Sequence, residues 1–435
     1  MNSAEATEIL SEIDFFALAS NMEIPDNIMP MMQYLPAGFA AYNAQKYKEA
    51  ESYFAAVLIA INNLKEQDPA TVLIEPIVNL MLGNAMRMQG RNRQAFGLYS
   101  YVVSLGTDTE KRSLIKELGG ISIKQIGLKA LFIKPLLALL TGSGLDEVVS
   151  DAYLYLAESA FSVSGIKFVE IGEIIEEGLR FLSDINHTEW EASLRLERAL
   201  LWLAQGKIDE ALREVEVSLS LRRRQKDYAG YALWVFINNL AYLQNIKEKH
   251  TDAIQTEQEI LKDQKKPTNA KCDAFINLAI SFSELGNINT ARDFAEKAIS
   301  LFDGDKTQRR TASAYATLAY VIAKGGDVSK AVSEVSQAWC IIRHNQSLTP
   351  LYPIRCLEVR LAQLQNIANS KSINQDSQDQ AKVVHLWQST LRWLAYAQKI
   401  TKEYVSRGGG YPFTKMLSEI ESKANVLASN LYLSN

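Results

Sequence analysis

Residues 275–302 read FINLAISFSELGNINTARDFAEKAISLF, and this stretch decides the fold. Phe275, Leu278 and Phe282 recur at the spacing i, i+3 and i+7, which predicts an amphipathic helix. Gly286 is placed to end that helix in a left-handed conformation, and a second helix follows the turn. The stretch therefore predicts an antiparallel helical hairpin.

The same plan recurs along the chain. Each copy has a small residue, such as Ala279, and an alanine twelve positions later, which lets two helices cross closely. Six copies are anchored on Ala50, Ala95, Ala211, Ala253, Ala291 and Ala331. Self-similarity at a period of about 40 residues predicts stacked hairpins that bury a continuous core against their neighbours.

This pattern resembles the tetratricopeptide repeat, in a variety with helices longer than usual. The shared features are a Leu-Gly or Leu-Ala pair, a later glycine, the anchor alanine and an apolar residue four positions beyond it. The family's proline after the second helix is absent from most copies. The resemblance implies an all-α, right-handed superhelical solenoid of seven or eight hairpins, closed by C-terminal capping helices.

The domain organisation follows from where the repeats stop. We expect a helical N-terminal extension over residues 1–30 and the repeat array over 31–365, with a weak copy near Ala160 and degenerate sequence at about 111–145. Residues 366–382 are polar and aperiodic, which predicts a flexible insertion between helices. Capping helices are expected over 383–435, the first with Val384, Trp387, Leu391 and Leu394 on one stripe.

Bulk composition excludes several classes of protein. The 46 basic and 50 acidic residues give a net charge of −4, so we expect no nucleic-acid partner. No run of about 18 uncharged apolar residues is present, and residues 121–140, the most apolar stretch, carry three lysines. That stretch indicates a buried degenerate repeat, with membrane-surface or partner contact as the alternative. A cytoplasmic location is expected, since the N-terminus does not resemble a signal peptide.

No motif indicates catalysis. The sequence has no phosphate-binding loop, no zinc-protease motif, no nucleophile elbow and no dinucleotide fingerprint. Cys340, His344 and Cys356 could approach one another, but ordinary packing explains them, so we expect neither a metal nor a cofactor. The chain is predicted not to be an enzyme.

A binding groove is the remaining candidate site, because first helices line the concave face of such stacks. Asn239, Asn277 and Thr317 each stand two positions before the small residue of their repeat, so they should occupy equivalent places in the groove. Asparagine amides can pair with the backbone of an extended peptide, a role that the family resemblance also implies. The alternative is that these asparagines only bridge neighbouring helices. The complete predicted groove comprises Asn239, Tyr242, Asn277, Ile280, Thr317 and Tyr320.

The sequence thus predicts a scaffold or adaptor that binds another protein, or an extended peptide, in its groove. A peptide-sensing regulator is one alternative, and a membrane-surface assembly factor that uses residues 121–140 is another. The aromatic C-terminal helix is also a candidate surface for self-association. Neither the partner nor the process follows from the sequence, because this fold serves many pathways.

Overall fold

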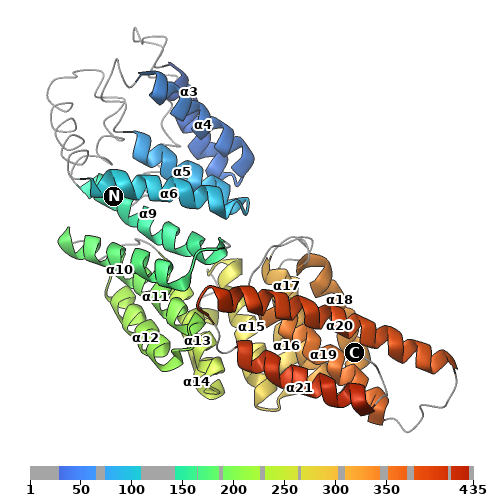
Figure 1. The fold of residues 1–435 in the computed structure, drawn as a ribbon. Coiled ribbons are helices and arrows are strands. Elements are labelled where there is room, and N and C mark those ends of the chain that lie inside the picture. Colours follow the sequence, from blue (N-terminus) through green and yellow to red (C-terminus); the bar gives the residue numbers. More distant parts are fainter. Residues whose placement is uncertain are drawn as a thin grey trace. The chain divides into compact units, whose positions relative to one another are not determined.

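A computed structural model describes residues 29–64, 74–108, 143–163, 165–185, 190–225, 231–262, 266–301, 309–342, 351–369, 377–409 and 413–430. The expected N-terminal extension up to residue 28, the apolar stretch 121–140 and His344 lie outside them. In the described ranges all regular structure is helical, which confirms the predicted all-α class (Figure 1).

The chain divides into two compact units, which we describe separately. Unit 1 comprises residues up to Glu197 together with 224–231, and unit 2 comprises 198–223 and everything from Ala232 onward. The division falls inside one helix. Because the repeats stack locally, each unit keeps its own core.

Unit 1 consists of helices that pair as antiparallel hairpins. In chain order they are α3 (Met29–Asn43), α4 (Tyr47–Leu64), α5 (Glu75–Met88), α6 (Asn92–Thr107), α9 (Ser143–Ser162), α10 (Phe168–Asp184) and the start of α11 (Glu191–Ala204). A Cβ on Gly83 of α5 would lie only 2.6 Å from Cε1 of Tyr99 on α6. The glycine is therefore required for the close approach of these two helices.

Unit 2 continues the hairpins and ends in three further helices. It holds the rest of α11, then α12 (Ile208–Arg224), α13 (Leu233–Ile246), α14 (His250–Leu261), α15 (Thr268–Glu284), α16 (Ile288–Ser300), α17 (Arg309–Lys324) and α18 (Val328–Ile342). The last three are α19 (Leu351–Asn369), α20 (Ser377–Ser406) and α21 (Phe413–Asn430). Helices α19 and α20 reach into the predicted insertion 366–382 from both sides.

The six anchor alanines are the centre of the packing, since none of them has any exposed surface. The residues four positions after them are equally buried: Phe54, Tyr99, Val215, Glu257, Ala295 and Val335. One of these six is a glutamate. An acid at a core position needs compensating hydrogen bonds, which the neighbouring residues must supply.

Left-handed residues end the first helix of each described hairpin. Gly286 has φ +82° and Gly326 has φ +92°, as the pattern predicts. Two turns use residues other than glycine at this place, namely Gln45 with φ 60° and Glu248 with φ 59°. The backbone plan is thus kept even where the sequence signal for it is missing.

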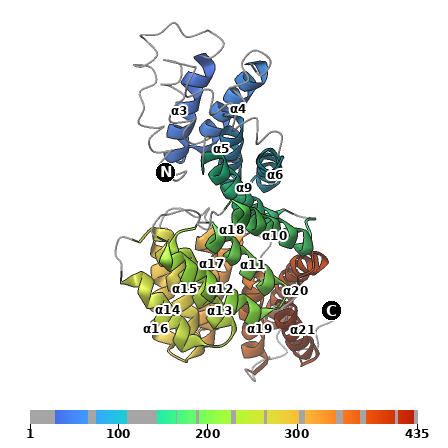
Figure 2. The same cartoon turned by 90° about the vertical axis from the view of Figure 1, so that its left-hand side faces the viewer.

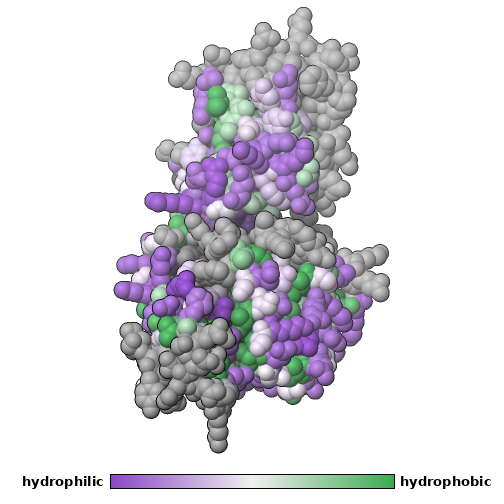
Figure 3. All heavy atoms as spheres, turned by 90° about the vertical axis from the view of Figure 1, so that its right-hand side faces the viewer, coloured by the Kyte–Doolittle hydropathy of each residue, from purple (hydrophilic) through white to green (hydrophobic). Residues whose placement is uncertain are grey.

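Apolar residues that remain at the surface do not gather into one broad patch on the face drawn in Figure 3. There the green apolar atoms of the described residues lie in narrow strips between purple hydrophilic ones. Many buried apolar side chains of unit 2 instead belong to an interior cluster that extends from α15 to α21, and a smaller cluster gathers around Ile276 and Ile280.

Candidate functional site

The six predicted groove residues lie on three successive first helices of unit 2. Asn239 and Tyr242 belong to α13, Asn277 and Ile280 to α15, and Thr317 and Tyr320 to α17. The first helices lie side by side, because α13 packs on α15, α15 on α17 and α17 on α19. We call the side formed by α13, α15, α17 and α19 the inner face.

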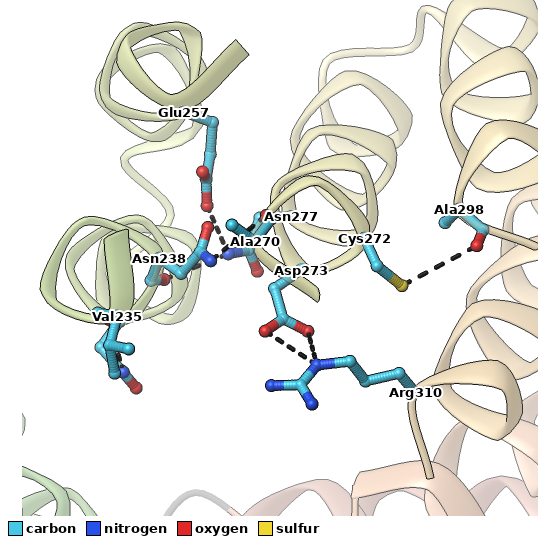
Figure 4. A network of polar contacts seen from close by, with 10 residues as sticks. Val235, Asn238, Glu257, Ala270, Cys272, Asp273, Asn277, Ala298 and Arg310 are labelled. Carbon is cyan, nitrogen blue, oxygen red and sulfur yellow. Dashed lines mark hydrogen bonds and ion pairs between the residues drawn. The ribbon is translucent and has the colours of Figure 1, made fainter. Parts of the chain in front are cut away.

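Asn277 is committed to contacts inside the protein. It is buried, and its Nδ2 donates to Oε1 of Glu257 at 2.6 Å and to the backbone oxygen of Asn238 at 3.1 Å (Figure 4). These bonds join α15 to both helices of the preceding hairpin. For Asn277 the geometry matches the alternative of a bridging asparagine, and binding of a peptide by this amide stays a prediction.

Glu257 holds a proton at neutral pH in this environment. Burial raises its pKa to about 8, although the hydrogen bond from Asn277 acts in the opposite direction. The side-chain amide of Asn238 faces the Glu257 carboxyl group. If the amide nitrogen points toward the carboxyl group, it donates to Oε2 at 2.8 Å. If the amide oxygen points there instead, it accepts a hydrogen bond from the protonated carboxyl over the same distance. The raised pKa favours the protonated form.

The other predicted polar residues are partly engaged as well. Asn239 is half-buried and donates to the backbone oxygen of Val235, four residues earlier in its own helix, at 2.8 Å. Thr317 has no exposed surface, and its hydroxyl accepts from Nη1 of Arg355 on α19 at 3.2 Å. Ile280 is almost completely buried. Of these residues, Asn239 keeps the most accessible surface without a bond to another helix.

Tyr320 belongs to a charged group at the margin of the inner face. Its hydroxyl donates to Oε1 of Glu284 at 2.6 Å, and Lys324 Nζ donates to Oε2 of the same carboxylate at 2.7 Å. Burial acts against ionisation of Glu284, but these two hydrogen bonds hold its pKa below the usual value. Arg355 lies over the Tyr320 ring, 5.7 Å from its centroid. This margin can therefore offer both charges and aromatic surface to a ligand.

Helix α20 belongs to the apolar core of unit 2. In Figure 1 and in Figure 2 it lies beside α21. Its residues Trp387 and Trp393 share one apolar cluster with Ala279 of α15 and Ala316 of α17. Near its end, Tyr404 has a raised pKa because of burial and because of the neighbouring Tyr242 of α13. The helix thus reaches from α19 to α13.

The buried stripe of α20 differs by one residue from the expected one. Val383 is buried, whereas Val384 is 43% exposed. Trp387 is buried and Leu391 and Leu394 pack against the cluster, as the pattern predicts. Helix α20 packs on α19 and α21, and its C-terminal end reaches the neighbourhood of Tyr242 on α13.

Unit 1 has a polar network that the sequence did not reveal. Nη1 of Arg87 binds Glu158 at 2.7 Å, and the Tyr231 hydroxyl donates to Glu197 at 2.7 Å. Burial and the nearby Glu158 raise the pKa of Glu197 to about 8. Glu158 and Glu197 stand two positions before Ala160 and Ala199, in the register that Asn239 and Asn277 occupy in unit 2.

A signal for the Asn238–Glu257–Asn277 network was present in the sequence. Glu257 stands four positions after its anchor Ala253, where the other repeats have an apolar residue. A single acid at a core register predicts buried hydrogen-bonding neighbours, and Asn238 next to Asn239 is such a candidate.

Neither a metal site nor a membrane span emerges from the described residues. No group of three His, Cys, Asp or Glu side chains there could hold a metal ion, and Cys356 is buried while Cys340 is exposed. No described helix is both long and apolar enough to cross a membrane.

Repeated hairpins with a buried anchor alanine and a left-handed turn residue define a helical-repeat protein of the tetratricopeptide type. Solved structures with a similar helical arrangement include proteins described as tetratricopeptide repeat proteins. No family model matches the sequence, and no curated protein does.

Three of those structures illustrate the likeness. A Rap protein complexed with competence and sporulation factor is 12% identical, with 92% of this chain and 98% of that chain covered and a TM-score of 0.45. A tetratricopeptide repeat protein from Parabacteroides merdae is 13% identical over 76% and 99% of the two chains, with a TM-score of 0.38. The type IV pilus biogenesis factor PilW is 15% identical over 63% and 98%, also with a TM-score of 0.38.

Proposed function

We propose that this protein is a non-enzymatic scaffold that holds a segment of another protein against the inner face of unit 2. One observation carries the proposal: α13, α15, α17 and α19 lie side by side, and half-buried aromatic and polar side chains of these first helices remain accessible on one face. The predicted groove residues Asn239, Tyr242 and Tyr320 belong to the same face and are half-buried rather than enclosed.

The margin of this face supplies selectivity. Glu284, Lys324 and Arg355 present charges of both signs around Tyr320. Charges at the rim of an interface govern specificity and the rate of association more than affinity. A partner segment with an apolar stripe flanked by charged residues would therefore complement this face. The cytoplasm is the proposed place of action.

The test is affinity purification with mass spectrometry of the tagged full chain and of an Asn239→Ala/Tyr320→Ala variant. Asn239 bonds only within its own helix and the Tyr320 bond to Glu284 lies at the exposed margin, so the variant should fold. The matched control is Gln255→Ala/Asp293→Ala, at exposed positions on second helices α14 and α16. We expect a partner that the control retains and the groove variant loses at least tenfold. A partner captured equally by all three would place recognition elsewhere.

The two alternative roles predicted from the sequence lack a specific supporting observation. A peptide-sensing regulator would use the same face, and a short peptide ligand would raise the melting temperature by an amount that grows with the logarithm of its concentration relative to Kd. A membrane-surface role rests on residues 121–140, outside the described residues.

A further inference from the structure

A second cluster of polar side chains belongs to unit 1 and not to the inner face of unit 2. It consists of Arg87 on α5, Tyr155 and Glu158 on α9, Glu197 on α11 and Tyr231, and all five residues belong to unit 1. We call this group the Glu197 cluster. The scaffold role proposed above makes no use of it.

Tyr231 joins the two carboxyl groups of the Glu197 cluster. Its hydroxyl donates to Oε1 of Glu197 at 2.7 Å and lies 3.3 Å from Oε2 of Glu158. Its backbone nitrogen donates to the Ser193 hydroxyl on α11 at 2.8 Å, which holds this residue in place. The two carboxyl groups therefore lie around one hydroxyl, close enough for a single ligand group to reach both.

The Glu197 cluster has one cation for two acids. Nη1 of Arg87 forms an ion pair with Oε1 of Glu158 at 2.7 Å, and the guanidinium lies over the Tyr155 ring, 4.9 Å from its centroid. The side chain of Glu197 bonds only to Tyr231 among the described residues, so its Oε2 has no hydrogen bond there. Because only 3% of Glu197 is exposed, water compensates for little of this. A donor from another molecule would therefore stabilise the carboxyl group.

In the free protein a proton takes the place of that donor. Burial raises the pKa of Glu197 to about 8, and the nearby Glu158 acts in the same direction, while the bond from Tyr231 and the charge of Arg87 act against it. These are the charged and titratable groups that face Glu197, and they come from α5, α9 and the segment before α13. A cation at Oε2 would favour the ionised carboxylate and displace the proton.

The side chains around Glu197 suit a planar cation. Tyr155, Glu158 and Tyr231 are half-buried and keep accessible surface. Arg87 shows that one carboxylate and one tyrosine ring hold a guanidinium in this cluster. A guanidinium has several donors in one plane, so it can bind carboxylates and stack on a ring, whereas the ammonium of lysine is compact and strongly hydrated.

We propose that the Glu197 cluster binds an arginine side chain of a partner protein, with the incoming guanidinium at Oε2 of Glu197 and the carboxyl proton released to solvent. Two guanidinium groups then face two carboxylates, so the charges balance. The site lies in unit 1 and does not depend on the scaffold role of unit 2. Because a proton leaves as the arginine enters, binding becomes tighter as the pH rises.

The first experiment uses N-acetyl-arginine methylamide as the probe and N-acetyl-citrulline methylamide as its neutral analogue of similar shape. Ligand-observed NMR measures the binding of each to the full chain. The arginine probe should bind at least about tenfold more tightly at about pH 8 than at about pH 6, because binding requires the ionised carboxylate. The citrulline probe should not bind. Equal binding of the two probes, no binding of the arginine probe, or an affinity that does not rise with pH overturns the inference.

Two matched variants test the assignment to Glu197. Glu197→Gln removes the charge and keeps the shape, so it should weaken binding of the arginine probe at least tenfold and abolish the pH dependence. Glu177→Gln is the control, because the Glu177 carboxylate also accepts from a tyrosine hydroxyl, that of Tyr153 at 3.1 Å, but is exposed on α10. It should bind the probe as wild type does. Equal affinity of a folded Glu197→Gln chain and wild type would contradict the proposal.

A further measurement needs no variant in the cluster. Calorimetry of wild type with the arginine probe, in buffers of different ionisation enthalpy, counts the protons released. Near pH 7 about 0.9 proton should leave for each probe bound, since Glu197 is mostly protonated beforehand. Binding without proton release excludes Glu197 as the site. The Asn239→Ala/Tyr320→Ala variant should bind the probe normally, whatever the fate of the scaffold role. Loss of probe binding in that variant would assign the probe to unit 2 and overturn the inference.

Discussion

At the scale of single residues, the turn between α13 and α14 contains a residue with a strained backbone conformation. Glu248 is exposed and adopts φ 59°, in the left-handed region where most of the other described turns place glycine. A residue with a Cβ in that region costs about 1–2 kcal/mol. The lower backbone freedom of glutamate in the unfolded chain offsets about 0.4–1 kcal/mol of this.

We therefore predict that Glu248→Gly raises the free energy of unfolding by about 0.5–1 kcal/mol, measured by urea denaturation. The matched control is Gly286→Ala, at the same turn position with φ +82° and no atom within 4 Å of the new Cβ. It should lower stability by about 1 kcal/mol. Loss of stability in Glu248→Gly would mean that the glutamate side chain stabilises the turn.

At the scale of an element, α20 provides a test through its two buried threonines. The Thr390 hydroxyl donates to the Leu386 backbone oxygen at 2.9 Å, whereas Thr401 Oγ1 has no such bond among the described residues. Removing an unsatisfied buried hydroxyl relieves a penalty of about 1–3 kcal/mol, since an apolar methyl takes its place.

Thr401→Val should therefore stabilise unit 2 by about 1 kcal/mol in chemical denaturation and slow hydrogen exchange in α20. Thr390→Val loses a hydrogen bond and should be neutral or destabilising. A destabilised Thr401→Val would show that the hydroxyl is satisfied in solution.

At the scale of the whole molecule, each unit contains a fully buried glutamate whose pKa is raised to about 8. Burial raises the pKa of Glu197 in unit 1 and of Glu257 in unit 2 to about 8, from an ordinary value of 4.5. A folded pKa above the unfolded one means that the folded state binds more protons between these values. The stabilising contribution is thus complete below pH 4.5 and is lost as the pH rises to about 8.

The free energy of unfolding should accordingly fall between pH 5 and pH 8, by up to about 1.4 kcal/mol per pH unit for each group. Glu197→Gln and Glu257→Gln cannot titrate, so each should reduce the slope, and the double variant should reduce it further. Denaturation at several pH values measures this. An unchanged slope in both single variants would refute the assigned protonation.

The hairpins could be predicted because their signal is local. The anchor alanines and Gly286 act within one repeat, so a period in the sequence is enough to place them. The environment of the predicted groove residues was harder to predict from the sequence. Asn277 and Thr317 are buried against partners about 20 to 40 residues away in the chain, Glu257 and Arg355. The approach of α20 to α13 joins positions about 160 residues apart, and no pattern in either segment encodes that contact.

The two protonated glutamates also alter how the folded molecule migrates in an electric field. Composition gives −4 with every acid ionised and an isoelectric point of about 5.8. With Glu197 and Glu257 neutral, two negative charges disappear near that pH. In isoelectric focusing, the native chain should therefore have a higher isoelectric point than the same chain in urea. The difference between the two isoelectric points should become smaller when both positions carry glutamine.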